Sequence, residues 1–319
     1  MTSWTRRPHR APWPHETHGH ETHGHEHAGL LVVGDVVTDV VARHAAPLVR
    51  GTDTAAGIRI LPGGAGANVC CWAADGGCGD VRILARVGEE DVAWHAERLR
   101  AAGVRPLLVT DAELGTATVI ALVDASAERT FLTDSGAVLR LEPDDWSPEL
   151  LDGVGHLHLS GYLFFADSSR EVARTAMDAA RARGIPVSVD PASAGFITAM
   201  GVDATLSALD GVDILLPNAD EARLLTGLDD PAEAAAELSG LAPLTVVTLG
   251  ADGALVAESG KVTARVPAYP AEPVDSTGAG DAFTGAFLAA RLCGADAATA
   301  AEAGCRAGAQ AVTLIGGRP

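Results

Sequence analysis

Lysine is almost absent from this chain, and its absence excludes two large classes of nucleotide-binding enzyme. Lys261, in the segment ESGKV, is the single lysine among 319 residues. A P-loop requires GxxxxGK[ST], and the protein-kinase pattern requires a lysine in a strand after a glycine-rich loop. Lys261 fits neither pattern, and we expect it to lie in a hairpin turn. The sequence therefore predicts no phosphate site built on a lysine.

Positive charge, long apolar runs and paired cysteines are also scarce. A formal net charge of -19 at pH 7 argues against nucleic-acid binding, which needs a basic face. No apolar stretch is long enough to span a membrane. After Arg6 and Arg7 comes a histidine-rich stretch, where a secretion signal would be apolar. The five cysteines form no CxxC pair, which predicts reduced thiols in a cytoplasmic protein.

Residues 1–28 differ from the rest of the chain. They contain seven of the eleven histidines and repeat ETHGH twice. Such a segment has little apolar surface to bury, so we expect a disordered extension. Because imidazole is a common metal ligand, weak binding of Ni²⁺ or Zn²⁺ is one hypothesis. A solvated extension without a role, or a translation start assigned too far upstream, is the alternative.

From Leu30 onward, short apolar runs alternate with amphipathic segments. Spacing predicts helices at 91–103 and 168–184, and the apolar runs predict strands at 30–33, 81–88, 154–161, 185–191, 212–218 and 244–250. Continuous apolar strands separated by helices indicate a parallel sheet covered on both faces. We therefore expect residues 29–319 to form one α/β domain around a doubly wound, mostly parallel sheet.

Two stretches interrupt this alternation. Residues 115–134 read as a β-hairpin, and residues 44–61 are strand-like without a following helix. We interpret them as a small β-sheet lid set off from the α/β body. An additional edge hairpin that does not move is the competing interpretation.

The segment VDSTGAGDAF (274–283) carries two glycines between two carboxylates. A dinucleotide-binding loop requires GxGxxG after a first strand, but Phe283 occupies the third glycine position here. The segment GGAGAN (63–68) also lacks a third glycine, and we find no strong strand before it. Neither segment is a good dinucleotide loop.

The residues after Asp281 have helical spacing with one apolar face, which places the glycines at a helix start. The N–H groups of Gly278, Ala279 and Gly280 would then be unpaired at the positive end of the helix and suited to an anion. We expect the helix dipole to favour the carboxylate of Asp281 and give it a low pKa. A carboxylate of low pKa is a weak base, but it suffices for phosphoryl transfer, because the reaction mainly requires the acceptor hydroxyl to be in line with the phosphoryl group. An N-cap aspartate beside turn glycines is the alternative.

DSTGAGDAFTGAF resembles the second signature of the ribokinase-like (PfkB) carbohydrate kinases, and GGAGANVCCWAA (63–74) resembles the first. Four further segments occur in the same order as in the family: VVGDVVTD, VSVDP, PNADEARLLTG and VVTLGADGALV. The resemblance therefore covers residues 30–319. It implies the ribokinase-like fold and ATP-dependent phosphorylation of a hydroxyl of a small sugar. A nucleoside acceptor, or a non-catalytic sugar- or nucleotide-binding regulator, is the alternative. A metal-storage role for the histidine-rich extension is a third.

The resemblance implies specific roles for several residues. Asp281 resembles the catalytic base, and the backbone of residues 278–281 resembles an anion hole. Asp39, Gly64 and Asn68 resemble the residues that hold the substrate hydroxyls, since carboxylate and amide oxygens accept hydrogen bonds and the amide also donates. Taken singly, Asp39 reads equally as a turn residue and Asn68 as a helix-start residue.

The resemblance also implies sites for ATP, Mg²⁺ and K⁺. Asn218 and Glu221 resemble an NxxE element that organises Mg²⁺ and its waters near the triphosphate, and they read equally as a capped helix start. The strand and turn that line the nucleotide are represented by Thr248, Gly250 and Gly253. A monovalent-cation site beside the anion hole is represented by Asp275, Thr277 and the carbonyls near Gly316.

Departures from the family pattern limit what the resemblance implies about the acceptor. Ala65 stands where ribokinases carry a lysine, Gly161 stands where they place an acidic contact, and Glu90 and Ala93 replace a common Asp and Gly. Cys305 stands where relatives contact the adenine edge.

The aromatic residues Tyr162, Phe164 and Phe165 could line a wall for a nucleoside base, or they could belong to the core. Since lid strands pair between subunits in relatives, the resemblance also implies a homodimer through the lid.

Overall fold

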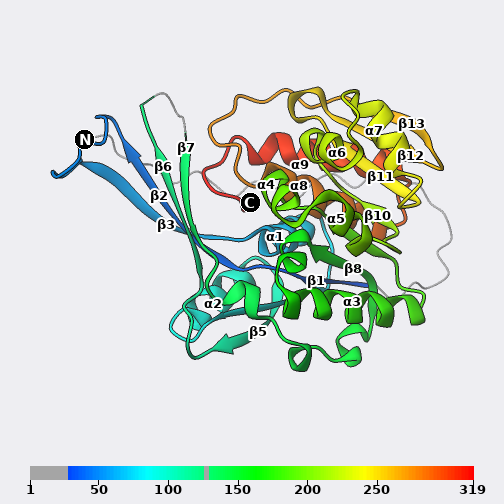
Figure 1. Cartoon of the computed structure of the whole chain (residues 1–319), viewed down its shortest axis with the longest axis horizontal. Coiled ribbons are helices and arrows are strands. Elements are labelled where there is room, and N and C mark those ends of the chain that lie inside the picture. Colours follow the sequence, from blue (N-terminus) through cyan, green and yellow to red (C-terminus); the bar gives the residue numbers. More distant parts are fainter. Residues whose placement is uncertain (1–27, 126–128) are drawn as a thin grey trace.

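The computed structural model describes residues 28–125 and 129–319, and its body is built on one large sheet (Figure 1). This nine-stranded sheet has the order β13-β12-β11-β10-β9-β8-β1-β4-β5. All neighbours from β5 to β11 are parallel, and β12 and β13 extend the sheet as an antiparallel hairpin. The strands are β1 (Gly29–Val33), β4 (Val81–Gly88), β5 (Val104–Asp111), β8 (Val154–Ser160), β9 (Val187–Asp190), β10 (Ile214–Leu215), β11 (Leu244–Thr248), β12 (Ala254–Glu258) and β13 (Lys261–Val266).

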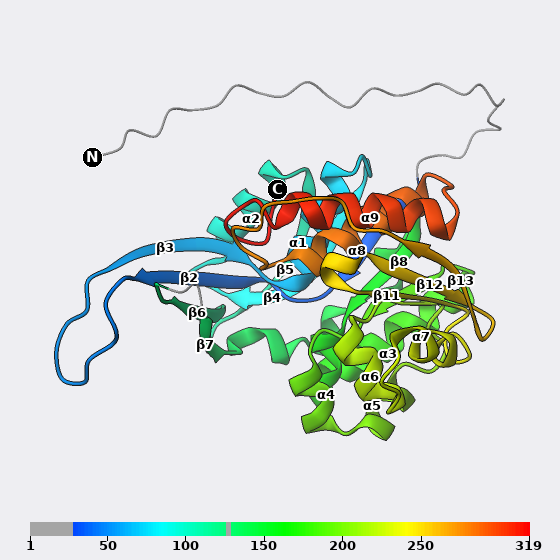
Figure 2. The ribbon, with the colours of Figure 1, turned by 90° about the horizontal axis from the view of Figure 1, so that it is seen from above.

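Strand β1 shows why both faces of the sheet are covered. Leu30 and Val32 point into one core, and Leu31 and Val33 point into another, since side chains of a strand alternate between faces. Figure 2 shows helices on both faces of the sheet. The face of Leu30 and Val32 is covered by α1 (Ala65–Asp75), α2 (Val92–Ala101), α8 (Ala279–Leu292) and α9 (Ala297–Ala311). The opposite face is covered by α3 (Asp167–Ala182), α4 (Ala194–Met200), α5 (Val202–Ala208), α6 (Ala219–Thr226) and α7 (Pro231–Leu238). The predicted doubly wound α/β fold is confirmed.

Short 3-10 helices lie in the connections between these elements. They span Gly136–Arg140, Pro143–Asp145, Pro148–Leu151, Gly161–Phe165 and Gly250–Asp252. The predicted hairpin turn is formed by Ser259 and Gly260, and Lys261 lies just after it, as the first residue of β13.

A second, four-stranded sheet projects from the body (Figure 1). It contains β3 (Ala56–Gly63), β2 (Val37–His44), β6 (Ala117–Val123) and β7 (Arg129–Asp134), in that order. The predicted hairpin at 115–134 is confirmed by the antiparallel pair β6 and β7. The predicted segment 44–61 is placed too late, because the first strand begins at Val37 and residues 45–55 join the strands. Asp39 therefore lies within a strand and not in a turn.

The two faces of this small sheet differ in chemistry. Val37, Asp39, Val119, Phe131 and Thr133 alternate onto the face that lines a pocket of the body. The register places Ile60, Val40, Ile120 and Leu132 in one apolar row on the opposite face. In this row Ile60 is 63% exposed and Leu132 is 55% exposed.

Two predictions concern features outside this fold. Among the described residues, no helix is long and apolar enough to cross a membrane. The predicted disorder and metal binding of residues 1–28 fall almost entirely outside the described residues, so they stay predictions.

Candidate functional site

Polar residues follow several neighbouring strands at one edge of the large sheet. Asp35 follows β1, Asp190 ends β9, Asn218 follows β10 and Thr248 ends β11. In an open α/β sheet, ligands bind outside the carboxyl ends of the strands, at the point where the strand order reverses. The chain leaves β1 toward β4 and β5 on one side and toward β8 to β11 on the other, so this edge is that point.

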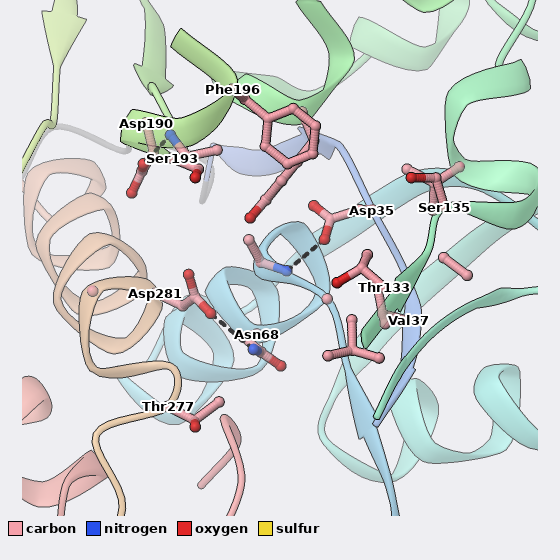
Figure 3. A pocket seen from close by; sticks show the side chains of 18 of the residues that line it. Asp35, Val37, Asn68, Thr133, Ser135, Asp190, Ser193, Phe196, Thr277 and Asp281 are labelled. Carbon is pink, nitrogen blue, oxygen red and sulfur yellow. Dashed lines mark hydrogen bonds between the residues drawn. The ribbon is translucent and has the colours of Figure 1, made fainter. Parts of the chain in front are cut away.

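A pocket of about 590 Å³ opens at this edge, between the body and the small sheet (Figure 3). Most of the predicted substrate, metal and catalytic residues line it: Asp39, Gly64, Asn68, Asn218, Glu221, Thr248, Thr277, Gly280 and Asp281. These residues come from β2, the start of α1, the start of α6, the end of β11 and the start of α8. The fold thus gathers segments that are more than 200 residues apart in sequence.

A second pocket, of about 640 Å³, adjoins the first at Thr248 and Gly280, which line both. The predicted nucleotide residues Thr248, Gly250 and Gly253 lie here, together with Ala279 and Cys305. A site with two compartments that meet at a helix start can hold two ligands end to end. No residue that lines either pocket is a lysine or an arginine.

Asp281 lines the first pocket from the first turn of α8, next to Gly280, which lines both pockets. Asn68 donates a hydrogen bond from Nδ2 to Oδ2 of Asp281 over 2.8 Å (Figure 3). The pKa of Asp281 is raised to about 8, mainly by burial, and the hydrogen bond from Asn68 opposes a further rise caused by Asp190, Asp35 and Asp39. The predicted low pKa is therefore wrong, because desolvation and neighbouring carboxylates outweigh the helix dipole.

The chain makes a sharp turn into α8. Gly278 has φ of 75°, and a Cβ there would lie 2.4 Å from Cα of Gly317, so the position requires glycine. Among the described residues, the N–H groups of Gly278 and Gly280 have no hydrogen-bond partner. Ala279 donates a long hydrogen bond to the carbonyl oxygen of Ser276 over 3.4 Å, which differs from the predicted free N–H.

The segment GGAGAN forms a sharp turn into α1. Gly64 has φ of 97°, and a Cβ there would lie 2.6 Å from the carbonyl oxygen of Asp35. The carboxylate of Asp35 accepts hydrogen bonds from the N–H of Ala65 (2.7 Å) and of Gly66 (3.0 Å), and thereby caps the helix (Figure 3). The expectation that no strand precedes this segment is wrong, because β3 ends at Gly63.

Asn218 and Glu221 form the predicted helix cap. Oδ1 of Asn218 accepts from the N–H of Glu221, and Oε2 of Glu221 accepts from the N–H of Asn218, each over 2.9 Å. Glu221 is buried beside the pocket, and burial together with the charge of Asp190 raises its pKa. Its second carboxylate oxygen, Oε1, accepts no hydrogen bond from the described residues. A cap and a ligand role are therefore compatible.

The residues predicted for a monovalent cation also meet. Asp275 accepts hydrogen bonds at Oδ1 from the N–H of Thr277 (2.9 Å) and at Oδ2 from the N–H of Gly316 (3.2 Å). These bonds tie the loop before α8 to the segment after α9. Within the described part of the chain, no group of three or more His, Cys, Asp or Glu side chains is arranged to hold a metal ion.

One wall of the first pocket is aromatic. Tyr162 and Phe196 line it with ring centroids 5.3 Å apart, and Phe131 of the small sheet lines it as well. Phe165 stacks on Phe196 with a centroid distance of 4.5 Å. Of the three predicted aromatics, Phe164 belongs to the core instead, with 5% of its surface exposed.

Sequence reasoning missed several residues of this site. Asp35 follows a predicted strand and Asp190 lies near the end of another, positions that could have identified them. Phe196 lies on a short helix, and Arg318 lies in a segment without periodicity, so neither residue has a comparable signal in the sequence. Arg318 donates to Oδ1 of Asn68 over 3.1 Å, behind the pocket.

Comparison with known proteins agrees with this geometry. The chain matches the pfkB family carbohydrate kinase over residues 28–319. A fructokinase of Klebsiella pneumoniae is 30% identical over 271 residues, which cover 81% of this chain and 82% of that protein. A 2-dehydro-3-deoxygluconokinase of Thermoproteus tenax is 31% identical over 263 residues, which cover 79% and 80%.

Among solved structures, a putative ribokinase II from E. coli in complex with ATP and Mg²⁺ superposes with a TM-score of 0.81 at 25% identity. The superposition covers 91% of this chain and 94% of that one. Since the family match spans both sheets and both pockets, the chain belongs to the pfkB family of carbohydrate kinases and is an ATP-dependent kinase.

Proposed function

We propose that this protein transfers the γ-phosphoryl group of ATP to a hydroxyl of a small sugar, with Asp281 as the base. The observation that carries the proposal is the place of Asp281. It lines the pocket that contains the polar side chains, directly after Gly280, where that pocket adjoins a second pocket lined mainly by small residues. Asp281 accepts the hydroxyl proton as the acceptor oxygen bonds to the γ-phosphorus. The bond from that phosphorus to the bridging oxygen breaks, and ADP leaves.

The backbone at the start of α8 would stabilise the transferring group. The free N–H groups of Gly278 and Gly280 lie at the positive end of a helix, where an anion is favoured without lysine. Acceptor hydroxyls would be held by Asp39, Asn68 and the backbone at Gly64, which line the first pocket. The base of ATP would lie in the second pocket, along Thr248, Gly250 and Gly253.

Mg²⁺ fits this site, because the triphosphate carries charge that no lining cation neutralises. Glu221 lines the pocket, and its Oε1 accepts no hydrogen bond from the described residues. Carboxylate oxygens are ligands that Mg²⁺ prefers, directly or through water. When bound, Mg²⁺ would neutralise phosphate charge.

We further propose that K⁺ binds beside Asp275, Thr277 and the backbone near Gly316, where it would stiffen the loop before α8.

The small sheet would act as a lid and as a dimer surface. Asp39, Val119 and Phe131 face the first pocket, so movement of this sheet toward the body would exclude water from the reacting groups.

The opposite face of the small sheet carries the exposed apolar row of Ile60 and Leu132, which pairing with a second copy of the chain would cover. Light scattering on wild type and Ile60→Asp tests this, with a monomeric wild type as the contradicting result.

A nucleoside acceptor is the second candidate, and the aromatic wall favours it. Tyr162, Phe196 and Phe131 would stack on a planar base, whereas a sugar uses mainly the polar side of the pocket. The two candidates share Asp281 and the start of α8, so they differ in the acceptor and not in the chemistry.

ADP release across a panel of sugars and nucleosides tests both candidates, with Asp281→Asn beside wild type. We expect acceptor-dependent release from wild type with at least one compound, and a loss of about 100-fold or more in the variant. Background hydrolysis by both proteins on every acceptor would refute the proposed function.

A further inference from the structure

Arg318 lies directly behind Asn68 and reaches it from a segment that crosses between α1 and α8. Oδ1 of Asn68 accepts a hydrogen bond from Nε of Arg318 (3.1 Å), and the carbonyl oxygen of Gly63 accepts one from Nη2 (2.7 Å). Its third nitrogen, Nη1, is buried without a partner among the described residues. Arg318 lines neither pocket, so it does not contact a ligand there.

The segment that carries Arg318 is held on both sides. The N–H of Gly316 donates to Asp275, and the carbonyl oxygen of Gly317 accepts from Nε1 of Trp72 over 2.9 Å. A Cβ on Gly317 would lie 2.3 Å from Nδ2 of Asn68, so the backbone passes directly against the amide. The position of the guanidinium is therefore set by α1 and by the loop before α8.

The side-chain amide of asparagine can be oriented in two ways, and its partners decide between them. A guanidinium only donates hydrogen bonds, so Arg318 requires the oxygen of Asn68 on its side. The NH₂ group of Asn68 is then directed to Oδ2 of Asp281, at 2.8 Å. In the opposite orientation, Arg318 would face an NH₂ group and Asp281 would face an oxygen, and both contacts would be repulsive.

We propose that Arg318 is a positioning residue, which fixes the amide of Asn68 so that its NH₂ group donates to Asp281. The inference rests on the proposed function, in which Asp281 is the base. The titratable groups that act on Asp281 are Asp35, Asp39 and Asp190, and Tyr162 lies near it in the pocket. Burial raises the pKa of Asp39 to about 6, and the positive charge of Arg318 opposes part of that rise.

Arg318→Met tests the proposal, with Arg318→Lys as the conservative variant. In Arg318→Met we expect kcat/KM at pH 7 to fall about 10-fold, since a charge-assisted hydrogen bond is lost. The low-pH side of the profile of kcat/KM against pH (the acid limb) should move to higher pH by about half a unit or more. The reason is that the carboxylate of Asp281 loses a hydrogen-bond donor that stabilises its charged form. Arg318→Lys keeps a donor and should retain most activity. Arg291→Met, at the far end of α8, is the control and should leave the acid limb in place.

A mutant cycle separates positioning from a general structural role. If Arg318 acts through Asn68, Arg318→Met should cause no further shift of the acid limb in an Asn68→Ala background. An equal loss at every pH in both backgrounds, or no loss at all, would overturn the proposal. A pH titration of the Asp281 carboxyl group, followed by ¹³C NMR, gives a readout that does not depend on turnover. The titration midpoint should rise in Arg318→Met. This result is expected even if Asp281→Asn keeps full activity, which would refute the proposed function. An unchanged midpoint would overturn the inference alone.

Discussion

Replacing Asp281 by Asn should remove turnover and stabilise the fold in the same protein. The carboxylate of Asp281 is held among Asp190, Asp35 and Asp39, and its pKa is raised from 3.8 to about 8. The folded protein therefore binds a proton that the unfolded chain releases, and ionisation of Asp281 destabilises the fold. Asn cannot ionise, and its Oδ1 can still accept the hydrogen bond from Asn68.

The shift sets the size and the pH window of the effect. A shift from 3.8 to about 8 is about 4 pKa units, or at most about 6 kcal/mol at about 1.4 kcal/mol per unit. This full value is reached only above pH 8, where Asp281 is ionised in both the folded and the unfolded state. The contribution of Asp281 to stability is greatest below pH 4 and falls as pH rises toward 8, so the advantage of Asp281→Asn grows over that window.

Thermal unfolding followed by calorimetry checks this prediction. We expect Tm of Asp281→Asn to exceed that of wild type by up to about 9 °C at pH 8.5 and by less than half of that at pH 5.5. Acceptor-dependent ADP release should fall about 100-fold or more in the same samples. A variant that is less stable at pH 8.5, or an advantage that does not grow with pH, would refute the account of Asp281.

Three further predictions concern the rest of the site. At low concentrations of both substrates, the rate should rise about tenfold per unit from pH 6 and level off near pH 8, where Asp281 ionises, and a flat profile would contradict this. Glu221→Gln should raise the Mg²⁺ concentration that gives half-maximal rate about 10-fold, as measured by Mg²⁺ titration of activity. An unchanged Mg²⁺ concentration at half-maximal rate would mean that Glu221 only caps α6. Phe196→Ala should raise KM for a nucleoside about 10-fold and spare a sugar, and equal effects on both would argue against stacking.

The parallel sheet could be predicted because its strands are apolar throughout. The strands at 81–88, 154–160 and 244–248 agree with the predicted ranges to within two residues. Strand β5 was missed, since Arg105 and Pro106 interrupt its apolar pattern, although Pro is tolerated at a sheet edge. The first strand of the small sheet was placed too late, since Thr38 and Asp39 interrupt the apolar pattern at the start of β2.

The residues of the site could be predicted, but their electrostatics could not. The family signatures placed Asp281, Asn68 and Glu221, and all three line one pocket. The pKa of Asp281 depends on side chains that the fold brings from β1, β2 and β9, and on burial that no local pattern reports. The contact of Arg318 with Asn68 spans 250 positions, so it too becomes visible only in the structure.

Transfer of the γ-phosphoryl group to an acceptor hydroxyl is the central claim, and ³¹P NMR follows it directly. With MgATP and the best acceptor of the panel, wild type should produce a phosphomonoester signal and ADP in equal amounts, while Asp281→Asn should produce neither above background. Release of inorganic phosphate without a phosphomonoester, or equal product from both proteins, would contradict the account.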